Sequence, residues 1–290
     1  MFLIPEPQKL THTVIQISDT HIVPEGSLMM GKVDTHANLV AALEQVEKSG
    51  VQVDALLLTG DLADKGELDA YRRLRDTVEP VAERIGAPVL YVMGNHDSRG
   101  PFREGLLGAE PTADTPHDYV HWAGDLRIIV LDSTEPDEHA GLLSDAQLGW
   151  LADELATAAP AGTVLALHHP PVPSPVEMLN GMILSQSAEL ADVLRGSDVK
   201  IVVCGHAHHA SAGSIGGVPV WVAGATAYSA RTLGPADQFA GLTGGFYTRL
   251  DVFPLGAVAT SVPVDPGAAV YEMNLADMAE LAAEYGLTSA

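Results

Sequence analysis

The sequence predicts an α/β fold, and two observations support this. Short apolar runs typical of β-strands alternate along the chain with longer segments in which apolar residues recur at helical spacing. Polar residues rich in Asp, Asn and His follow directly after several of these apolar runs. The carboxyl ends of the strands in α/β sheets are where ligands gather, so we expect these polar residues to meet at one edge of a sheet.

Six apolar runs are predicted as strands of the sheet. The run at 55–58 is apolar without interruption, as a strand buried on both faces should be. Two further segments late in the chain, 218–222 and 245–252, are predicted as strands of hairpins. The six runs are residues 13–17, 55–58, 88–93, 127–131, 163–167 and 199–203.

Four segments are predicted as helices from the spacing of their apolar residues. In the first, Leu39, Leu43 and Val46 fall on one face. The last is amphipathic, with Asn274 as its N-cap and Gly286 as its C′ residue, and we expect it to pack on the core. The four helices are residues 36–48, 67–85, 144–157 and 274–286.

Composition bounds the class of protein. With 290 residues, 47% hydrophobic and 18% charged, the chain can bury a large core, and we expect one domain over residues 1–290 with 265–290 as a C-terminal extension. The single cysteine, Cys204, excludes internal disulfides and multi-cysteine zinc sites. Without a basic N-terminal flank or a long apolar run, the chain is expected to be cytoplasmic, with no signal peptide and no membrane insertion.

Charge points to the kind of site. Thirty-eight acidic and fifteen basic residues give a formal charge of −23, which argues against a nucleic-acid polymer or an anionic membrane as partner. An anionic substrate would need a local positive charge. Histidine is the commonest metal ligand, and seven of the twelve histidines fall in short clusters. These are His21, His96, His168, His169, His206, His208 and His209.

The polar residues after the strands form a candidate set of metal ligands. Asp-x-His and His-x-His patterns place alternate side chains on the same side of an extended segment, so each pair can reach one metal region. One four-coordinate ion cannot use seven ligands, whereas two ions that share one carboxylate use eight ligand bonds. The candidates are Asp19, His21, Asp61, Asn95, His168, His206 and His208, with His96 left over.

These motifs resemble the five-block signature of the calcineurin-like metallophosphoesterases. Each block alone is a weak signal, but all five occur in the family's order and each follows a predicted strand. The closer resemblance is to the bacterial class III cyclic nucleotide phosphodiesterases and their glycerophosphodiesterase relatives. The blocks are Ser18-Asp19-Thr20-His21, Gly60-Asp61, Gly94-Asn95-His96-Asp97, His168-His169-Pro170-Pro171 and Gly205-His206-Ala207-His208.

The resemblance implies a fold and a division of the ligands. The fold is a four-layer α/β/β/α sandwich of two mixed sheets flanked by helices, and the late hairpins fit its second sheet. Asp61 bridges two metal ions. Of the adjacent pair His168 and His169 the resemblance favours His168, although the residues alone leave either possible. The first ion is implied to bind Asp19, His21 and His208, and the second Asn95, His168 and His206.

The resemblance also implies the reaction. It is hydrolysis of small phosphodiesters, above all 3′,5′-cyclic AMP and GMP, by in-line attack of a metal-bridging hydroxide. We expect His96 and Asp61 to be catalytic, and Asn95, His96 and His209 to contact the substrate. Nitrogen and oxygen ligands without thiolate suit Mn, Fe, Zn or Co, and we expect iron with manganese. A homodimer is the family expectation.

Alternatives remain open. The same site could act on glycerophosphodiesters, nucleotides or phosphoproteins, or the chain could be a catalytically silent interaction protein, although the intact ligand set argues against the latter. His209 is either an exposed neighbour or a substrate contact. We expect His169 to support a ligand or to pack, Asp97 to orient its loop or a ligand histidine, and Asp64 to be structural. Surface positions are expected for His12, His36, His117, His121 and His139.

Overall fold

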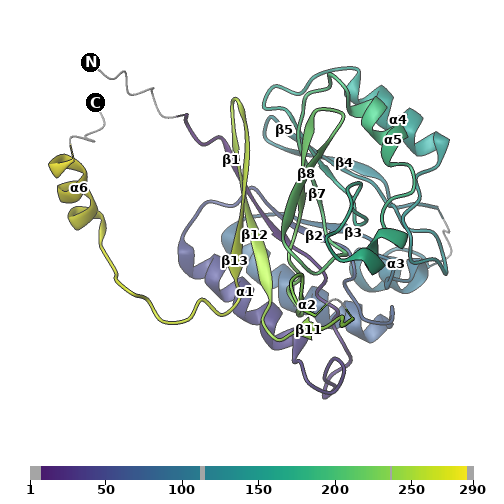
Figure 1. Cartoon of the computed structure of the whole chain (residues 1–290), viewed down its shortest axis with the longest axis horizontal. Helices are drawn as coiled ribbons and strands as arrows, with labels where there is room; N and C mark the ends of the chain where they lie inside the picture. The colour runs from purple at the N-terminus through teal and green to yellow at the C-terminus, as the bar shows by residue number, and fades with distance from the viewer. Residues whose placement is uncertain (1–7, 112–114, 236, 286–290) are drawn as a thin grey trace.

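Two mixed β-sheets pack face to face and carry helices on their outer faces (Figure 1). The computed structural model describes residues 8–111, 115–235 and 237–285. The buried apolar residues fall into three clusters, one between the sheets and one beneath each helical layer. The predicted α/β class and the four-layer arrangement are therefore confirmed.

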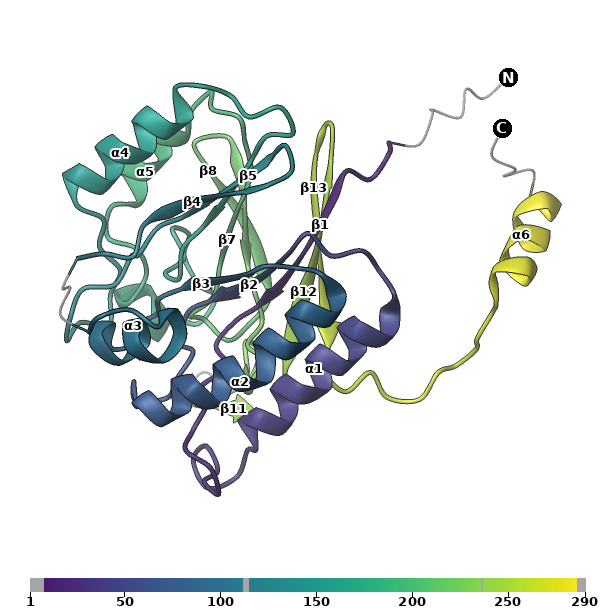
Figure 2. The same cartoon turned by 180° about the vertical axis from the view of Figure 1, so that it is seen from behind.

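The first sheet is formed by strands from the beginning and the end of the chain. β1, β2 and β3 are parallel, and the hairpin of β12 and β13 adds to them antiparallel, beside β1. Helices α1 (Thr35–Ser49) and α2 (Leu68–Ile85) cover the outer face (Figure 2). The strand order is β13 (Gly256–Pro263), β12 (Phe246–Phe253), β1 (His12–Ile17), β2 (Ala55–Thr59) and β3 (Val89–Val92).

The second sheet is built from the middle of the chain. β5, β6, β7 and β9 are parallel, with β4 and β8 antiparallel at the two edges. Helices α4 (Asp145–Leu155) and α5 (Ser187–Leu194) pack on its outer face. The strand order is β4 (Tyr119–Ala123), β5 (Leu126–Val130), β6 (Thr163–Ala166), β7 (Val199–Cys204), β9 (Val218–Val222) and β8 (Ser211–Ile215).

Apolar side chains fill the space between the sheets. Leu57 and Val92 from the first sheet join Ile128, Ala166 and Val203 from the second in one cluster, and each of these side chains is completely buried. The other face of each central strand is covered by helices, so both faces of β2 are buried. This explains why its sequence is continuously apolar rather than alternating.

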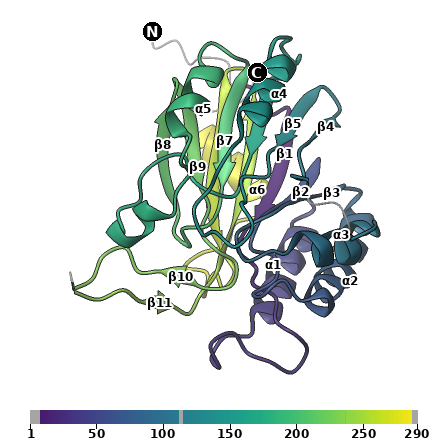
Figure 3. The ribbon, with the colours of Figure 1, turned by 90° about the vertical axis from the view of Figure 1, so that its right-hand side faces the viewer.

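Every predicted strand is present, but several elements had no clear sequence signal. Helix α3 (Arg99–Leu107) contains Gly100, Pro101 and Gly105, which lower helix propensity, and β8 carries small and polar residues without apolar alternation. The short strands β10 (Ser229–Ala230) and β11 (Gly241–Leu242) pair within a segment that protrudes below β8 and β9 (Figure 3). The elements not predicted are α3, α5, β4, β8, β13, β10 (Ser229–Ala230), β11 (Gly241–Leu242) and the 3₁₀ helix η1 (Glu177–Gly181).

The C-terminal helix α6 (Leu275–Glu284) forms where it was predicted. The side chain of Asn274 accepts hydrogen bonds from the backbone N–H groups of Ala276 and Asp277, while Gly286 lies outside the described residues. None of its residues is buried, and the helix lies apart from both sheets (Figures 1 and 2), so the expected packing on the core is wrong. No helix in the described ranges is long and apolar enough to span a bilayer. A single domain over residues 1–290 stays a prediction.

Candidate metal centre

The candidate ligands lie where strands of both sheets end. Asp19, Asp61 and Asn95 follow β1, β2 and β3 of the first sheet, whereas the histidines at 168, 206 and 208 follow β6 and β7 of the second. The two edges are joined by hydrogen bonds, including Gln16 Nε2 to the carbonyl oxygen of Cys204 at 3.1 Å. The site therefore straddles the junction of the two sheets at the carboxyl ends of their parallel strands.

Five of the seven candidate ligands have a left-handed backbone. Such conformations are uncommon for residues other than glycine and cost on the order of 1–3 kcal/mol each. They turn each chain sharply after its strand and direct the side chain back toward the junction. The five are Asp19 (φ 52°), His21 (φ 41°), Asp61 (φ 49°), His206 (φ 69°) and His208 (φ 54°).

Four of these side chains form a compact first group. Ligand atoms of Asp19, His21, Asp61 and His208 lie within 4.8 Å of one another. His21 Nε2 is 3.1 Å from His208 Nε2 and 3.6 Å from Asp61 Oδ2, and His208 Nε2 is 3.5 Å from Asp19 Oδ1. Ligands bound at about 2.1 Å to one tetrahedral ion would lie about 3.4 Å apart. The spacing therefore fits a single divalent ion.

A second group lies on the other side of Asp61. His168 Nε2 is 3.4 Å from Asp61 Oδ1, and His206 Nδ1 is 2.9 Å from Asn95 Oδ1. Nε2 of His168 is buried and has no hydrogen-bond partner among the described residues, which is the situation expected of a nitrogen that binds a cation. The two oxygens of Asp61 thus face different groups, the arrangement that a bridging carboxylate requires.

Neighbouring oxygens orient the imidazoles. His168 Nδ1 lies 2.8 Å from the carbonyl oxygen of Thr59, and His208 Nδ1 lies 3.0 Å from that of Tyr228. Each contact holds an N–H on Nδ1 and leaves Nε2 available as a metal ligand. His169 places its Nδ1 2.8 Å from Ser133 Oγ. Its Nε2 is buried without a hydrogen-bond partner among the described residues, and it forms a group of potential ligand atoms with His168 and His206, so the geometry leaves either histidine of the pair possible as a ligand.

Asp97 ties together the loops that carry Asp61 and Asn95. Its carboxylate accepts hydrogen bonds from the N–H groups of Leu62 and Ala63, both at 3.1 Å, and from Gly94 N at 2.9 Å. Desolvation and the nearby charge of Asp61 raise the pKa of Asp97 to about 6. The carboxylate is thus used for loop geometry, as the sequence suggested.

Two motif glycines allow this close approach. A Cβ at Gly94 would collide with the backbone N and the carboxylate of Asp61. A Cβ at Gly205 would collide with the side chains of Ser18 and Asp19. Glycine is needed at both positions because another ligand loop occupies the space of a side chain, from the adjacent strand β2 at Gly94 and from β1 of the other sheet at Gly205.

Burial and charge set the protonation of the imidazoles. Burial lowers the pKa of His206 to about 4 and that of His208 to about 3, so both are neutral at pH 7 and offer a lone pair. Burial also disfavours charge on His168, but the carboxylates of Asp61 and Asp19 outweigh it and raise its pKa to about 9. A cation must displace that proton, so metal affinity should fall as the pH is lowered.

His96 lies beside the first group rather than inside it. Its backbone N–H donates to Asp61 Oδ1 at 2.8 Å, and its Nδ1 is 2.7 Å from the carbonyl oxygen of Asp64. The side chain is 37% exposed, and its ring packs edge-on to His21 with 4.7 Å between centroids. The exposed part of the imidazole can therefore meet a bound substrate.

Two further histidines, His209 and His12, are buried, and a third borders the site. His209 is buried rather than exposed, with Nε2 2.8 Å from Ser174 Oγ. His12 is also buried, within β1, and lies 3.2 Å from Asp125. His139 is exposed as expected, but its Nδ1 lies 3.4 Å from Asn95 Nδ2 and so borders the site.

Asp64 is the main site residue that sequence reasoning missed. Its Oδ1 lies 3.5 Å from His21 Nδ1, and together with His96 these two residues form a further group of potential ligand atoms. Its position three residues after Asp61 was the available signal. The contribution of Tyr228 could not be foreseen, because it acts through its backbone carbonyl.

The fold and the site together define a class: an α/β/β/α protein with a candidate two-metal centre of nitrogen and oxygen ligands. The chain belongs to the calcineurin-like phosphoesterase family, whose model matches residues 12–210. The grouped Asp and His side chains provide a site for divalent metal ions, the ions that two-metal phosphoesterase centres use.

Individual relatives support the same family. The chain is 44% identical over 260 residues to a cAMP/cGMP dual specificity phosphodiesterase of Mycobacterium tuberculosis, covering 89% of this chain and 81% of that protein. It is 47% identical over 225 residues to a probable cyclic nucleotide phosphodiesterase of Rhodococcus erythropolis, covering 78% and 73%. A dimetal phosphatase from Danio rerio superposes with a TM-score of 0.58 at 16% identity, covering 87% of this chain and 99% of that chain, and this likeness concerns the fold alone.

Proposed function

We propose that this protein is a phosphodiesterase that uses two divalent metal ions to hydrolyse small phosphodiesters, with 3′,5′-cyclic AMP and GMP as its first candidate substrates. The observation that carries the proposal is the position of Asp61, whose two oxygens lie 3.6 Å from His21 Nε2 and 3.4 Å from His168 Nε2. The cyclic nucleotide phosphodiesterases named above, at 44% and 47% identity, support the choice of substrate.

The ligands divide into two sets around this carboxylate. Asp61 would contact both ions, which together would activate a water and neutralise charge in an in-line displacement. The donors are nitrogen and oxygen only, which suits Mn, Fe, Zn or Co, and iron with manganese is the pair that we propose. The first ion would be held by Asp19, His21 and His208, and the second by Asn95, His168 and His206.

Local charge resolves the conflict between an anionic substrate and an acidic protein. Two divalent ions and the carboxylates of Asp19 and Asp61 would leave about +2 at the centre, because the other ligands are neutral. The formal charge of −23 is spread over the whole chain and is screened beyond about 8–10 Å at physiological salt. At the short distances within the site, attraction of a phosphodiester anion should therefore prevail.

His96 and the cavities beside the centre would act on the substrate. The Asp64 carbonyl holds His96 Nδ1, so Nε2 would stabilise developing charge or protonate the leaving alkoxide. His209 lines a cavity of about 230 Å³ together with His208, which is the basis for proposing a substrate contact there. Asn95 borders a second cavity and would contact the substrate from that side.

A larger cavity supports a second set of candidate substrates for the same site. A cavity of about 560 Å³ is lined by residues of 175–178, 231–235 and 237–239, among them Met178, Arg231 and Phe239, and would give room to larger esters. Glycerophosphodiesters, nucleotides and phosphoproteins thus remain alternative substrates. A catalytically silent scaffold is disfavoured by the complete ligand set with His96 beside it. A cytoplasmic location and a homodimer are part of the proposal and rest on composition and family resemblance.

A substrate panel tests the proposal. The Mn²⁺-loaded protein is expected to hydrolyse bis(p-nitrophenyl) phosphate. Its kcat/KM for cyclic AMP or cyclic GMP should be at least about 10-fold higher than its kcat/KM for glycerophosphocholine, a mononucleotide or a phosphopeptide. Faster hydrolysis of the monoesters would favour a phosphatase. No hydrolysis of any ester at full metal content would favour the silent scaffold.

A further inference from the structure

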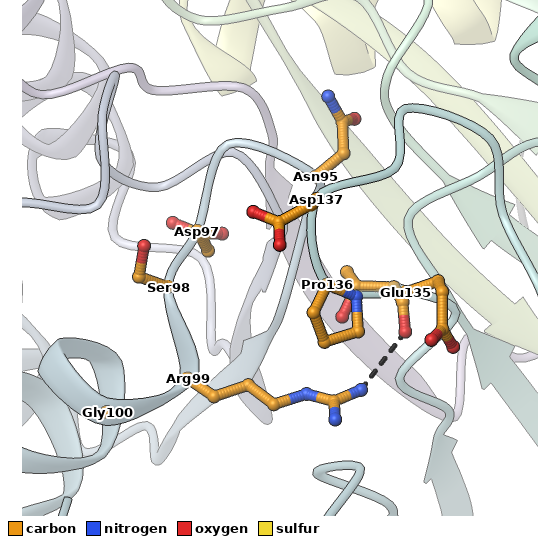
Figure 4. A pocket seen from close by; sticks show the side chains of 9 residues that line it. Asn95, Asp97, Ser98, Arg99, Gly100, Glu135, Pro136 and Asp137 are labelled. Atoms are coloured by element: carbon orange, nitrogen blue, oxygen red, sulfur yellow. Dashed lines mark hydrogen bonds between the residues drawn. The ribbon is translucent and has the colours of Figure 1, made fainter. Parts of the chain in front are cut away.

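A cavity of about 260 Å³ opens beside Asn95, next to the proposed second metal position (Figure 4). One wall is the segment 95–100, which leads from β3 into α3, and the other is the segment 134–137 after β5. Asn95 links the cavity to the centre, because its Oδ1 lies 2.9 Å from His206 Nδ1. A substituent of a phosphodiester bound at the metals could therefore extend into this space.

The two walls are fixed to each other before any ligand binds. The guanidinium of Arg99 donates to the carbonyl oxygen of Thr134 at 3.1 Å, and its Nε lies 3.7 Å from Oδ2 of the buried Asp132. Asp132 Oδ1 in turn accepts from Thr134 N at 2.9 Å. The backbone N–H of Ser98 donates to the hydroxyl of Tyr71 at 2.9 Å. The cavity is thus preformed, which reduces the ordering cost of binding.

The lining offers mainly hydrogen-bond acceptors. Glu135 and Asp137 contribute carboxylates, and within the described parts of the chain neither side chain has a hydrogen-bond or ion-pair partner. The carboxylate of Asp137 is directed toward the Ser98 side of the cavity (Figure 4). The lining holds these two exposed carboxylates against the single guanidinium of Arg99, which also lies near Asp132. A substituent here would meet acceptors and negative charge.

We infer that this cavity is the subsite for an uncharged substituent of the phosphodiester that carries N–H donors, and that Glu135 and Asp137 select against a second negative charge. The inference rests on the proposed function and specifies its substrate class. A donor such as a purine amino group would gain a partner among these carboxylates. An anionic group would be repelled, which at exposed sites corresponds to about 3- to 10-fold for two carboxylates a few ångströms away.

Two matched substrates test this selection. The two substrates are 2-carbamoylethyl p-nitrophenyl phosphate and 2-carboxyethyl p-nitrophenyl phosphate. They have the same leaving group, the same phosphoryl group and nearly the same shape, but the first ends in an uncharged amide and the second in a carboxylate. The Mn²⁺-loaded wild-type protein is expected to prefer the carbamoyl ester about 3- to 10-fold in kcat/KM. The double variant Glu135→Gln, Asp137→Asn should lower this ratio to about 2 or less while it keeps its metal content.

The control is Glu138→Gln, which removes an exposed carboxylate of the same segment that does not line the cavity. It should keep the wild-type ratio. If the wild-type protein did not prefer the carbamoyl ester, the inference would be overturned, whether or not the double variant folds. An unchanged ratio of kcat/KM for the two esters in a folded double variant would overturn it as well. If neither ester nor bis(p-nitrophenyl) phosphate were hydrolysed, the proposed function and the inference would fall together.

Discussion

Asp61→Asn is expected to lower kcat/KM for a phosphodiester by about 10³-fold or more and to reduce the bound metal to well below one ion per chain. Metal ions supply several kcal/mol of transition-state stabilisation in such centres, and about 1.4 kcal/mol corresponds to a tenfold change in rate. Asp61 faces both ligand groups, at 3.6 Å from His21 and 3.4 Å from His168. Its neutral replacement would leave the two cations insufficiently screened from each other, and elemental analysis of the purified variant measures the loss.

A control variant separates metal binding from the cost of altering a carboxylate that is largely buried and paired. Asp198→Asn disturbs an ion pair with Arg127 at 2.9 Å, at the opposite ends of β6 and β7 from the centre. This variant should lose stability but keep full metal content. An Asp61→Asn protein that bound two ions with unchanged affinity would show that the bridging assignment is wrong.

His96→Ala is expected to lower the rate with cyclic AMP by about 10²- to 10⁴-fold and to leave both metal ions bound, since the loss is that of a general acid or charge stabiliser. In the proposed centre the second ion would already have four donors, and His96 is held through its Nδ1 by the Asp64 carbonyl at 2.7 Å. The loss should be smaller for p-nitrophenyl esters, because p-nitrophenolate needs little protonation to leave. Metal analysis and a series of leaving groups measure the two effects.

The neighbouring residue provides the comparison. Asn95→Ala should lower the affinity for the second ion, because Asn95 Oδ1 lies 2.9 Å from His206 Nδ1, and excess Mn²⁺ should restore part of the activity. If His96→Ala lost metal and was rescued by excess Mn²⁺, His96 would be a ligand. If it kept metal and slowed all leaving groups equally, only charge stabilisation would remain as its role.

The sequence was most informative where local patterns determine structure. Strands such as β2 are continuously apolar, and the polar residue after each strand is a neighbour in sequence, so both could be recognised without knowing the tertiary fold. The convergence of Asp61 with His168 follows from the resemblance and from the rule that ligands gather at the carboxyl ends of strands. The late hairpins were predicted as well, although the edge strand β13 was not.

Features that depend on tertiary contacts could not be predicted. The left-handed backbone of Asp19 and His208 occurs in the sharp turns after β1 and β7. Asp and His tolerate this conformation better than most residues, but that weak preference does not indicate which Asp or His adopts it. The carbonyl of Tyr228 reaches His208 through the backbone, so its side chain gives no indication. The amphipathic pattern of α6 suggested burial, but apolar periodicity cannot indicate whether the rest of the chain presents a surface to cover it.

The two-metal centre is tested most directly by a stoichiometric titration of the metal-depleted protein with Mn²⁺. Calorimetry measures the binding, and hydrolysis of bis(p-nitrophenyl) phosphate measures the activity of the same samples. Binding is expected to saturate at two ions per chain, and full activity is expected only when the second equivalent is bound. Chelation should abolish activity, and Mn²⁺ should restore it. Full activity with binding saturated at one ion per chain would contradict the shared-carboxylate centre on which the proposed function depends.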